Sequence, residues 1–117
     1  MMRYMLKKAD ILASQVDCGL RVVLGLYEGD TLAAMMVLHR VNHIALLYTD
    51  SEHRKKGYAK ALVAYASGYA TAFRKPVLTV DASDFGLGFY QKCGFVSTGF
   101  RTENDGITYT PMKLILQ

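Results

Sequence analysis

Basic residues around one glycine form the part of this sequence best suited to bind an anion. Four of the 14 lysines and arginines fall between Arg54 and Lys60. The residues after Gly57 follow a helical pattern, and the first turn of a helix carries unpaired N–H groups at its positive end. Small side chains at Gly57 and Ala59 let an anion approach the backbone, while the lysines neutralise its charge. This segment therefore predicts a diphosphate site, with a solvated helix start as the alternative.

A histidine and a glutamate are the candidates for a general base. In the strand-like segment 43–49, alternation places His43 on the same face as Leu47 and Thr49. Histidine has a reference pKa of about 6.5, so it can accept a proton at neutral pH, directly or through water. Glu28 is the alternative carboxylate. We predict His43 as the base, and a structural or surface histidine is the other interpretation.

Short helical and strand-like segments must position these residues. Residues 57–73 carry apolar side chains at a spacing close to 3.6, which predicts an amphipathic helix. Glycine between apolar runs predicts hairpin turns at 28–30 and 104–106. In all, helices are predicted at 4–16, 57–73 and 84–92, and strands at 20–27, 32–39, 43–49, 77–80, 95–101 and 107–116. This order predicts an α/β sheet, mostly antiparallel early and with helical crossovers later.

Length and composition restrict the class of protein. With 117 residues, 51% of them hydrophobic, the chain predicts one globular domain, residues 1–117. Cys18 and Cys93 lack the spacing of a disulfide framework or a zinc site, so we expect no metal. No run approaches the roughly 18 apolar residues of a membrane span, and the charged N-terminus is unlike a signal peptide. We therefore expect a cytoplasmic protein that binds no membrane.

Two segments resemble the motifs of one enzyme family. The acetyl-CoA motif of GCN5-related N-acetyltransferases (GNAT), Arg/Gln-x-x-Gly-x-Gly/Ala, resembles Arg54-Lys55-Lys56-Gly57-Tyr58-Ala59. The family's Phe-Tyr-x-x-x-Gly-Phe segment resembles Phe89-Tyr90-Gln91-Lys92-Cys93-Gly94-Phe95, where Tyr90 follows Arg54 by 36 residues. The resemblance covers about residue 20 to the C-terminus. It implies a GNAT-like α/β (α+β) fold, whose mixed, mostly antiparallel sheet has splayed central strands flanked by helices.

The resemblance also implies a reaction, the transfer of an acetyl group from acetyl-CoA to a primary amine in a ternary complex. Backbone groups of Leu47 and Thr49 would bind the pantetheine arm, and the N–H of Leu47 would stabilise the oxyanion. Tyr90 would protonate the leaving thiolate, and His43 stands where similar enzymes can have a carboxylate base. The residues implied in acetyl-CoA binding are Leu47, Tyr48, Thr49, Arg54, Lys55, Lys56, Gly57, Tyr58, Ala59, Lys60, Ser83 and Tyr90.

The sequence departs from the family pattern at three places. Ser83 stands where many relatives have an asparagine that contacts the cofactor, and Gly86 stands where an alanine is common. The residues before position 20 are expected to leave no room for the family's full first strand and two helices, which implies an N-terminally shortened fold. A partner subunit would then complete the acceptor site. Apolar excess and an exposed edge strand predict a homodimer.

Other functions remain open at this point. A degenerate relative would bind acyl-CoA without turnover, and a toxin-like relative would acetylate aminoacyl-tRNA. The net charge of +4 would also suit a nucleic acid. We consider a plain nucleic-acid-binding module unfavoured, because the sequence has no recognised motif or basic helix stripe. The amine acceptor, whether a small molecule or a protein, is not identified by these residues.

Overall fold

Most of the described chain forms strands of one sheet, in which buried and exposed side chains alternate. The computed structural model describes residues 2–6, 9–16, 21–50 and 57–116. The strands are β1 (Met2–Leu6), β2 (Ala9–Val16), β3 (Arg21–Glu28), β4 (Thr31–His39), β5 (His43–Thr49), β6 (Val77–Ala82), β7 (Val96–Ser97), β8 (Thr102–Asn104) and β9 (Ile107–Ile115). The helices are α1 (Tyr58–Ala72) and α2 (Leu87–Lys92). Neither of these described helices is long and apolar enough to cross a membrane.

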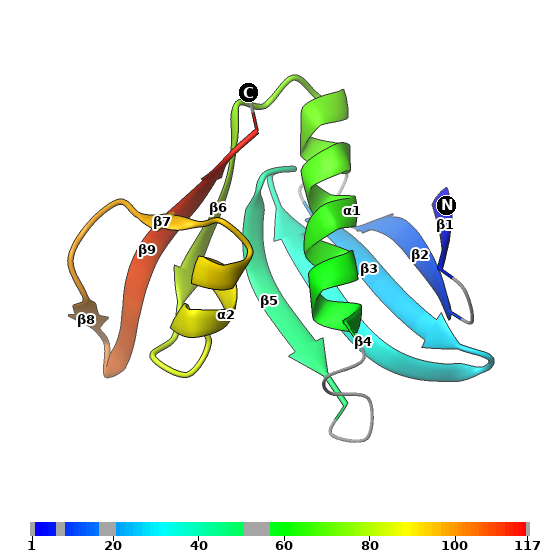
Figure 1. Cartoon of the computed structure of the whole chain (residues 1–117), viewed down its shortest axis with the longest axis horizontal. Helices are drawn as coiled ribbons and strands as arrows, with labels where there is room; N and C mark the ends of the chain where they lie inside the picture. Colours follow the sequence, from blue (N-terminus) through cyan, green and yellow to red (C-terminus); the bar gives the residue numbers. More distant parts are fainter. Residues whose placement is uncertain (1, 7–8, 17–20, 51–56, 117) are drawn as a thin grey trace.

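The sheet is antiparallel except at its centre. The strands follow the order β1-β2-β3-β4-β5-β6-β9-β7, and β8 pairs with β9. The β5–β6 pair is parallel and consists of His43 opposite Thr79 and Ile44 opposite Val80. Beyond Ile44 the two strands diverge, as Figure 1 shows. The sheet is therefore splayed between β5, the last strand of the antiparallel half, and β6, the first strand after the crossover helix α1.

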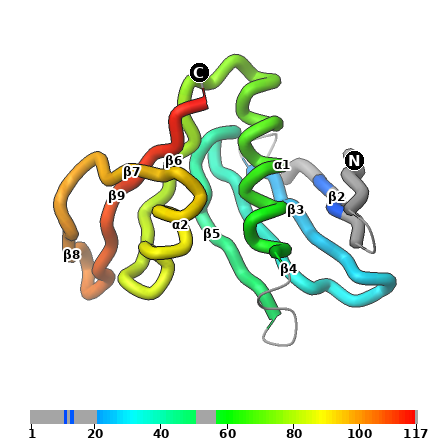
Figure 2. The backbone as a smooth tube through the Cα atoms, viewed as in Figure 1, coloured from blue at the N-terminus to red at the C-terminus, as the bar shows by residue number. Residues whose placement is uncertain are grey.

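The core lies between the sheet and α1. Both described helices lie on the same face of the sheet, the near face in Figures 1 and 2. The side chains of α1 that are buried against this face are Leu62, Val63, Ala66, Tyr69 and Ala70. Alternate residues of β3 and β4 meet them, including Leu24 and Met36, which have no exposed surface. Burial of one apolar face on each element is the main force that holds α1 over the sheet.

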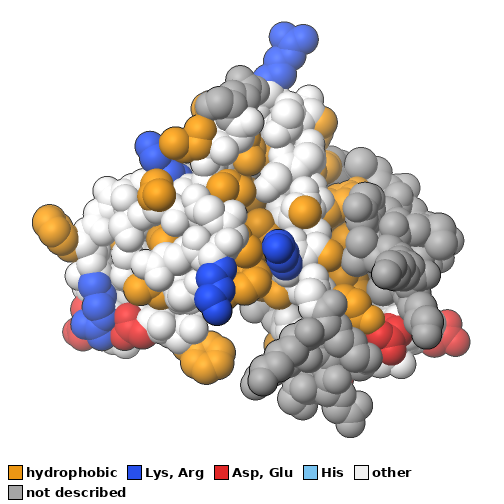
Figure 3. Space-filling view, viewed as in Figure 1, with side chains coloured by type: hydrophobic (Ala, Val, Ile, Leu, Met, Phe, Trp, Pro, Cys, Tyr) orange, Lys and Arg blue, Asp and Glu red, His pale blue; other side chains and the backbone are white. Residues whose placement is uncertain are grey.

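Charge on the helix-bearing face is dispersed. In Figure 3 the described lysine and arginine side chains stand apart from one another, separated by apolar side chains and backbone. They form no continuous basic stripe on the described part of this face.

The helix predicted at 4–16 is wrong, because this region forms the β1–β2 hairpin. Strand β2 pairs antiparallel with β3, placing Ile11 opposite Leu26 and Ala13 opposite Leu24. Ile11 and Ala13 are buried and lie two residues apart, which is the period of a strand. The apolar residues of this segment fit both periods. Pairing with β3 satisfies their backbone groups in extended form, and this tertiary contact overrides the local pattern.

The rest of the predicted order is confirmed, with shorter elements near the C-terminus. Helix α2 begins at Leu87 instead of residue 84, because residues 84–86 form a turn. Within the strand predicted at 95–101 only the two-residue strand β7 forms, and β8 follows it at Thr102–Asn104. The turn between β8 and β9 has positive φ at Asp105 (54°) and Gly106 (79°). Positive φ at both positions suits the tight hairpin turn that the sequence predicted there.

Candidate active site

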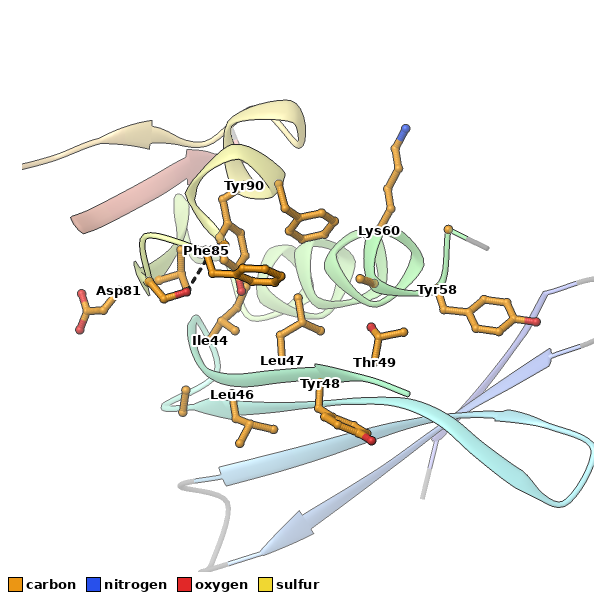
Figure 4. Close-up of a pocket in the computed structure, with 17 residues that line it drawn as sticks. Ile44, Leu46, Leu47, Tyr48, Thr49, Tyr58, Lys60, Asp81, Phe85 and Tyr90 are labelled. Carbon is orange, nitrogen blue, oxygen red and sulfur yellow. Dashed lines mark hydrogen bonds between the residues drawn. The ribbon is translucent and has the colours of Figure 1, made fainter. Parts of the chain in front are cut away.

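A cleft of about 590 Å³ opens where β5 and β6 diverge. Its walls come from residues 44–49 of β5, 57–60 at the start of α1, residues 80 and 81 of β6, and Ser83, Phe85, Gly86, Phe89 and Tyr90. Figure 4 shows the start of α1 with Tyr58 at one end of the cleft and Asp81 at the other. Two segments that the sequence connected only by their motifs therefore line one cavity.

A bulge in β5 determines which side chains face α1. Val37 pairs with Leu46 and Leu38 pairs with Ile44, so Ala45 is an extra residue in β5. In consequence Ile44, Leu47 and Thr49 point to the helix side of the strand, and Leu46 and Tyr48 point to the opposite side (Figure 4).

The predicted common face of His43, Leu47 and Thr49 is therefore wrong. Regular alternation would have placed them together, but the extra residue reverses the alternation between His43 and Leu47. His43 does not line the cleft. It lies on the sheet face opposite α1, where its Nδ1 is 2.7 Å from Thr79 Oγ1 and its Nε2 is 4.0 Å from Asp81 Oδ2.

The start of α1 offers backbone donors that no side chain of the described residues caps. Gly57 precedes the helix with φ of 79°, a left-handed conformation that glycine adopts without steric cost. No described side chain caps this end by a hydrogen bond, and the first turn contains no acidic residue. The N–H groups of Tyr58, Ala59 and Lys60 therefore face the cleft end with the positive pole of a 15-residue helix. The predicted Arg54, Lys55 and Lys56 lie outside the described residues.

Glu28 is held by the start of α1. The Tyr58 hydroxyl donates a hydrogen bond to Glu28 Oε2, and this bond is the main cause of the raised pKa of Tyr58. The contact links the end of β3 to the first turn of α1. Because its carboxylate already accepts this hydrogen bond, Glu28 is a poorer candidate for the general base than the sequence alone indicated.

Tyr90 packs in the core and also lines the cleft. The residue is 7% exposed, and its ring makes edge-to-face contacts with Phe89 and Phe95, each with centroids 5.2 Å apart. Its side chain also reaches the cleft, from α2 toward Ile44 and Leu47 (Figure 4). Burial, with a smaller contribution from Cys93, raises the pKa of Tyr90 to about 12. The hydroxyl therefore stays protonated and is a hydrogen-bond donor throughout the neutral range.

Comparison with known proteins identifies the family. The family model of the acetyltransferase (GNAT) domain matches residues 6–116. The chain belongs to this family. An uncharacterized N-acetyltransferase of Bacillus pumilus (strain SAFR-032) is 30% identical over 69% of this chain, and the match spans 57% of the length of that relative. This GNAT chain thus corresponds to a little more than half of its curated relative.

Solved structures share the fold at low sequence identity. A Bacillus subtilis acetyltransferase in complex with CoA is 22% identical, with a TM-score of 0.69 over 84% of this chain and 78% of that one. A streptothricin acetyltransferase homologue from Bacillus anthracis strain Ames, in complex with acetyl coenzyme A, is 21% identical. Its TM-score is 0.72 over 81% of this chain and 62% of that one. These likenesses confirm the GNAT fold predicted from the sequence.

Two of the three departures from the GNAT pattern, Ser83 and Gly86, lie together at the turn before α2. Ser83 Oγ accepts a hydrogen bond of 3.0 Å from the Gly86 N–H, so the serine stabilises this turn while lining the cleft. A Cβ at position 86 would lie 3.3 Å from Ser83 Oγ, closer than a comfortable contact. Glycine at 86 therefore accommodates serine at 83. The bidentate pair of Arg101 with Asp84, with a shortest distance of 2.7 Å, holds the same turn from outside and lowers the Asp84 pKa.

Sequence reasoning missed three residues of this region in the GNAT chain. Phe85 lines the cleft although it is 92% exposed, and Asp81 and Thr79 surround His43. A phenylalanine in a glycine-containing turn gives no periodic signal. The parallel register of β5 and β6 brings Thr79 and Asp81 to His43, and a sequence pattern contains no register information.

Proposed function

We propose that this chain is an acetyl-CoA-dependent N-acetyltransferase that transfers an acetyl group to a primary amine by direct attack in a ternary complex. The observation that supports this most is one cleft, which joins a helix N-terminus at Gly57, capped by no described side chain, to the Tyr90 side chain. One end suits an anionic diphosphate and the other suits proton transfer. The CoA complexes of two structural neighbours agree with this donor.

The proposed binding of acetyl-CoA relies mainly on backbone groups. The N–H groups at the start of α1 would hold the diphosphate, with Lys60 beside them. The edge of β5 beyond Ile44 has no strand partner on the β6 side among the described residues, so an extended pantetheine arm could bond to it as an added strand. Leu47 and Thr49 face the cleft on this edge, and the backbone of Tyr48 lies between them. Ser83 keeps its hydroxyl hydrogen available for the ligand.

The proposed transfer forms a C–N bond and breaks a C–S bond. The amine nitrogen attacks the thioester carbonyl, the Leu47 N–H stabilises the oxyanion, and the sulfur departs with the electron pair of the C–S bond. With a pKa of about 12, Tyr90 is a much weaker acid than an ordinary thiol, whose pKa is about 8.5. Tyr90 therefore stabilises the thiolate by hydrogen bonding, and gives up its proton only as it receives one from the attacking nitrogen.

The proposed general base remains His43, now placed on the opposite sheet face. It would act from the sheet face opposite α1, directly or through one water molecule. We also keep the homodimer and the cytoplasmic location as proposals. Static light scattering over a range of protein concentrations tests the first, and fractionation of cells expressing the chain tests the second.

Titration calorimetry with acetyl-CoA and a thiol-release assay against a panel of amines test the proposed function together. We expect micromolar binding and amine-dependent release. Release must fall in Tyr90→Phe and persist in Tyr69→Phe, since Tyr69 is equally buried but does not line the cleft. Binding without release for any amine would favour the non-catalytic acyl-CoA-binding alternative. Absence of binding at millimolar ligand would reject both.

A further inference from the structure

Where β5 and β6 diverge, the residues that line the cleft point to both faces of the sheet. Leu47 and Thr49 line it on the side of α1, whereas Leu46 and Tyr48 line it on the opposite side (Figure 4). The donor end at Gly57 and the hydroxyl of Tyr90 belong to the α1 side. A second substrate can therefore reach the reaction end from the opposite face without displacing the first.

On that opposite face, Asp81 and His43 present two hydrogen-bond acceptors. Thr79 Oγ1 donates to the carbonyl of Asn42 at 3.3 Å, so it accepts the proton of His43 Nδ1 at 2.7 Å. This network assigns the neutral ring a bare Nε2, which lies 4.0 Å from Asp81 Oδ2. The Asp81 side chain is 50% exposed, and among the described residues His43 is its ion-pair partner. A nitrogen placed about 2.9 Å from both atoms fits between them.

The group that satisfies two adjacent acceptors is a cation with several N–H donors. A primary ammonium donates to both and is attracted by the carboxylate. Asp81 lines the cleft, at the opposite end from the first turn of α1. An ammonium bound there would stand at the reaction end of the cleft, away from the diphosphate site.

Next to Asp81 the same face is apolar. Leu46 is 46% exposed and Tyr48 is 51% exposed. The register of β4 places Val37 beside Leu46 and Met35 beside Tyr48, so these four side chains form a continuous apolar shelf. Among the described residues that line the cleft, only Asp81 and Lys60 carry a charge, and Lys60 belongs to α1. A second ammonium or a carboxylate on the acceptor would find no charged partner among the described residues of the shelf.

We infer that Asp81 binds the ammonium group of the acceptor, and that the acceptor is a primary monoamine with an apolar or aromatic body lying on the shelf of Met35, Val37, Leu46 and Tyr48. This inference rests on the proposed acetyl transfer. The ammonium gives one proton to His43 Nε2, and the resulting imidazolium is stabilised by Asp81. The neutral nitrogen then forms the C–N bond as the C–S bond breaks, and its second proton reaches the sulfur through Tyr90. The products are an N-substituted acetamide, the CoA thiol, and a proton that His43 returns to solvent.

The test compares kcat/KM for three acceptors at saturating acetyl-CoA. 2-Phenylethylamine has one ammonium and an apolar body, spermidine has several cations, and phenylalanine adds a carboxylate. We expect 2-phenylethylamine to exceed each of the others by at least about 10-fold. Tyr48→Ala should reduce its advantage over methylamine, which has no body to contact the shelf. Preference for spermidine or phenylalanine would overturn the inference and leave the acetyltransferase proposal standing.

Asp81→Asn tests the residue itself. It should lower kcat/KM for 2-phenylethylamine by about 10- to 100-fold, mainly through KM, with the Kd of acetyl-CoA unchanged. Asp81→Glu should recover part of the loss, which a structural role would not explain. Asp30→Asn, the same chemical change at the exposed turn between β3 and β4, is the matched control. Wild-type kinetics in Asp81→Asn would overturn the inference, and no turnover with any amine would overturn it together with the proposed function.

Discussion

Replacing Tyr90 with phenylalanine removes one hydroxyl from the reaction end of the cleft and little else. The ring stays, and so do its edge-to-face contacts with Phe89 and Phe95 at 5.2 Å. Because no methylene is lost from the core, we expect the free energy of unfolding to change by less than about 1 kcal/mol. A loss of activity in this variant would therefore report chemistry instead of folding.

The expected loss follows from the state of the hydroxyl. Burial keeps it protonated, with a pKa of about 12, so it is available as a hydrogen-bond donor at every pH below roughly 10. A donor aimed at charge that develops in the transition state contributes about 100-fold to kcat. We predict a kcat about 100-fold lower in Tyr90→Phe and a Kd for acetyl-CoA within about threefold of wild type.

Thiol release and titration calorimetry measure these two quantities, with Tyr69→Phe as the control. A pH series adds a second check, because the folded-state pKa of Tyr90 lies above the tyrosine reference value of 10.0. Its contribution to stability should be complete below pH 10 and be lost as the pH rises toward 12. Undiminished kcat in Tyr90→Phe, or an equal loss in Tyr69→Phe, would refute the assigned role.

Three further predictions concern the backbone and charge around the cleft. Gly57→Ala should destabilise the fold by about 1 kcal/mol and weaken the binding of acetyl-CoA about 10-fold, because residue 57 has φ of 79° and alanine resists that conformation. Urea unfolding measures the first effect and calorimetry the second. An unchanged affinity for acetyl-CoA would count against the helix-start site. Arg40→Gly should raise stability by about 0.5 kcal/mol, because exposed Arg40 has φ of 53°; a lower melting temperature would contradict this. NMR titration should find the Asp84 pKa below the usual value, because of its hydrogen bonds to Arg101 and the charge of that side chain, and normal in Arg101→Gln. The stability that the Asp84–Arg101 pair adds should be present above the ordinary aspartate pKa, and it should be lost as the pH falls through the lowered pKa of Asp84. An Asp84 pKa that does not change in Arg101→Gln would disprove the link between the pair and this pKa.

Strong local patterns allowed much of the fold to be predicted. The alternation in β3 and β4 and the helical period of α1 each point to one structure, and Gly57 marks the helix start that the motif required. The segment 4–16 failed because its apolar residues fit both a helix and a strand. Pairing between β2 and β3 decided between them, with Ile11 opposite Leu26. Such pairing depends on distant residues and cannot be obtained from a local window.

The candidate site was predictable where it depends on motifs, and not where it depends on register. Leu47, Thr49, Tyr58 and Tyr90 line one cleft, as the spacing of the two motifs suggested. A single extra residue, Ala45, moved His43 to the other sheet face. No sequence period encodes a bulge, so neither that displacement nor the neighbouring Asp81 could be foreseen. The acceptor preference that we infer for this face was therefore absent from the sequence prediction.

The binding of the diphosphate at the start of α1 can be tested directly with a backbone-resolved NMR titration of CoA into the ¹⁵N-labelled chain. The amide signals of Gly57, Tyr58, Ala59 and Lys60 should show the largest shifts, followed by those of Leu47 and Thr49 on β5. Signals of the β8–β9 hairpin should stay in place. If the amides of residues 57–60 do not move at millimolar CoA while the protein remains folded, the proposed donor site and the acetyl transfer built on it are contradicted.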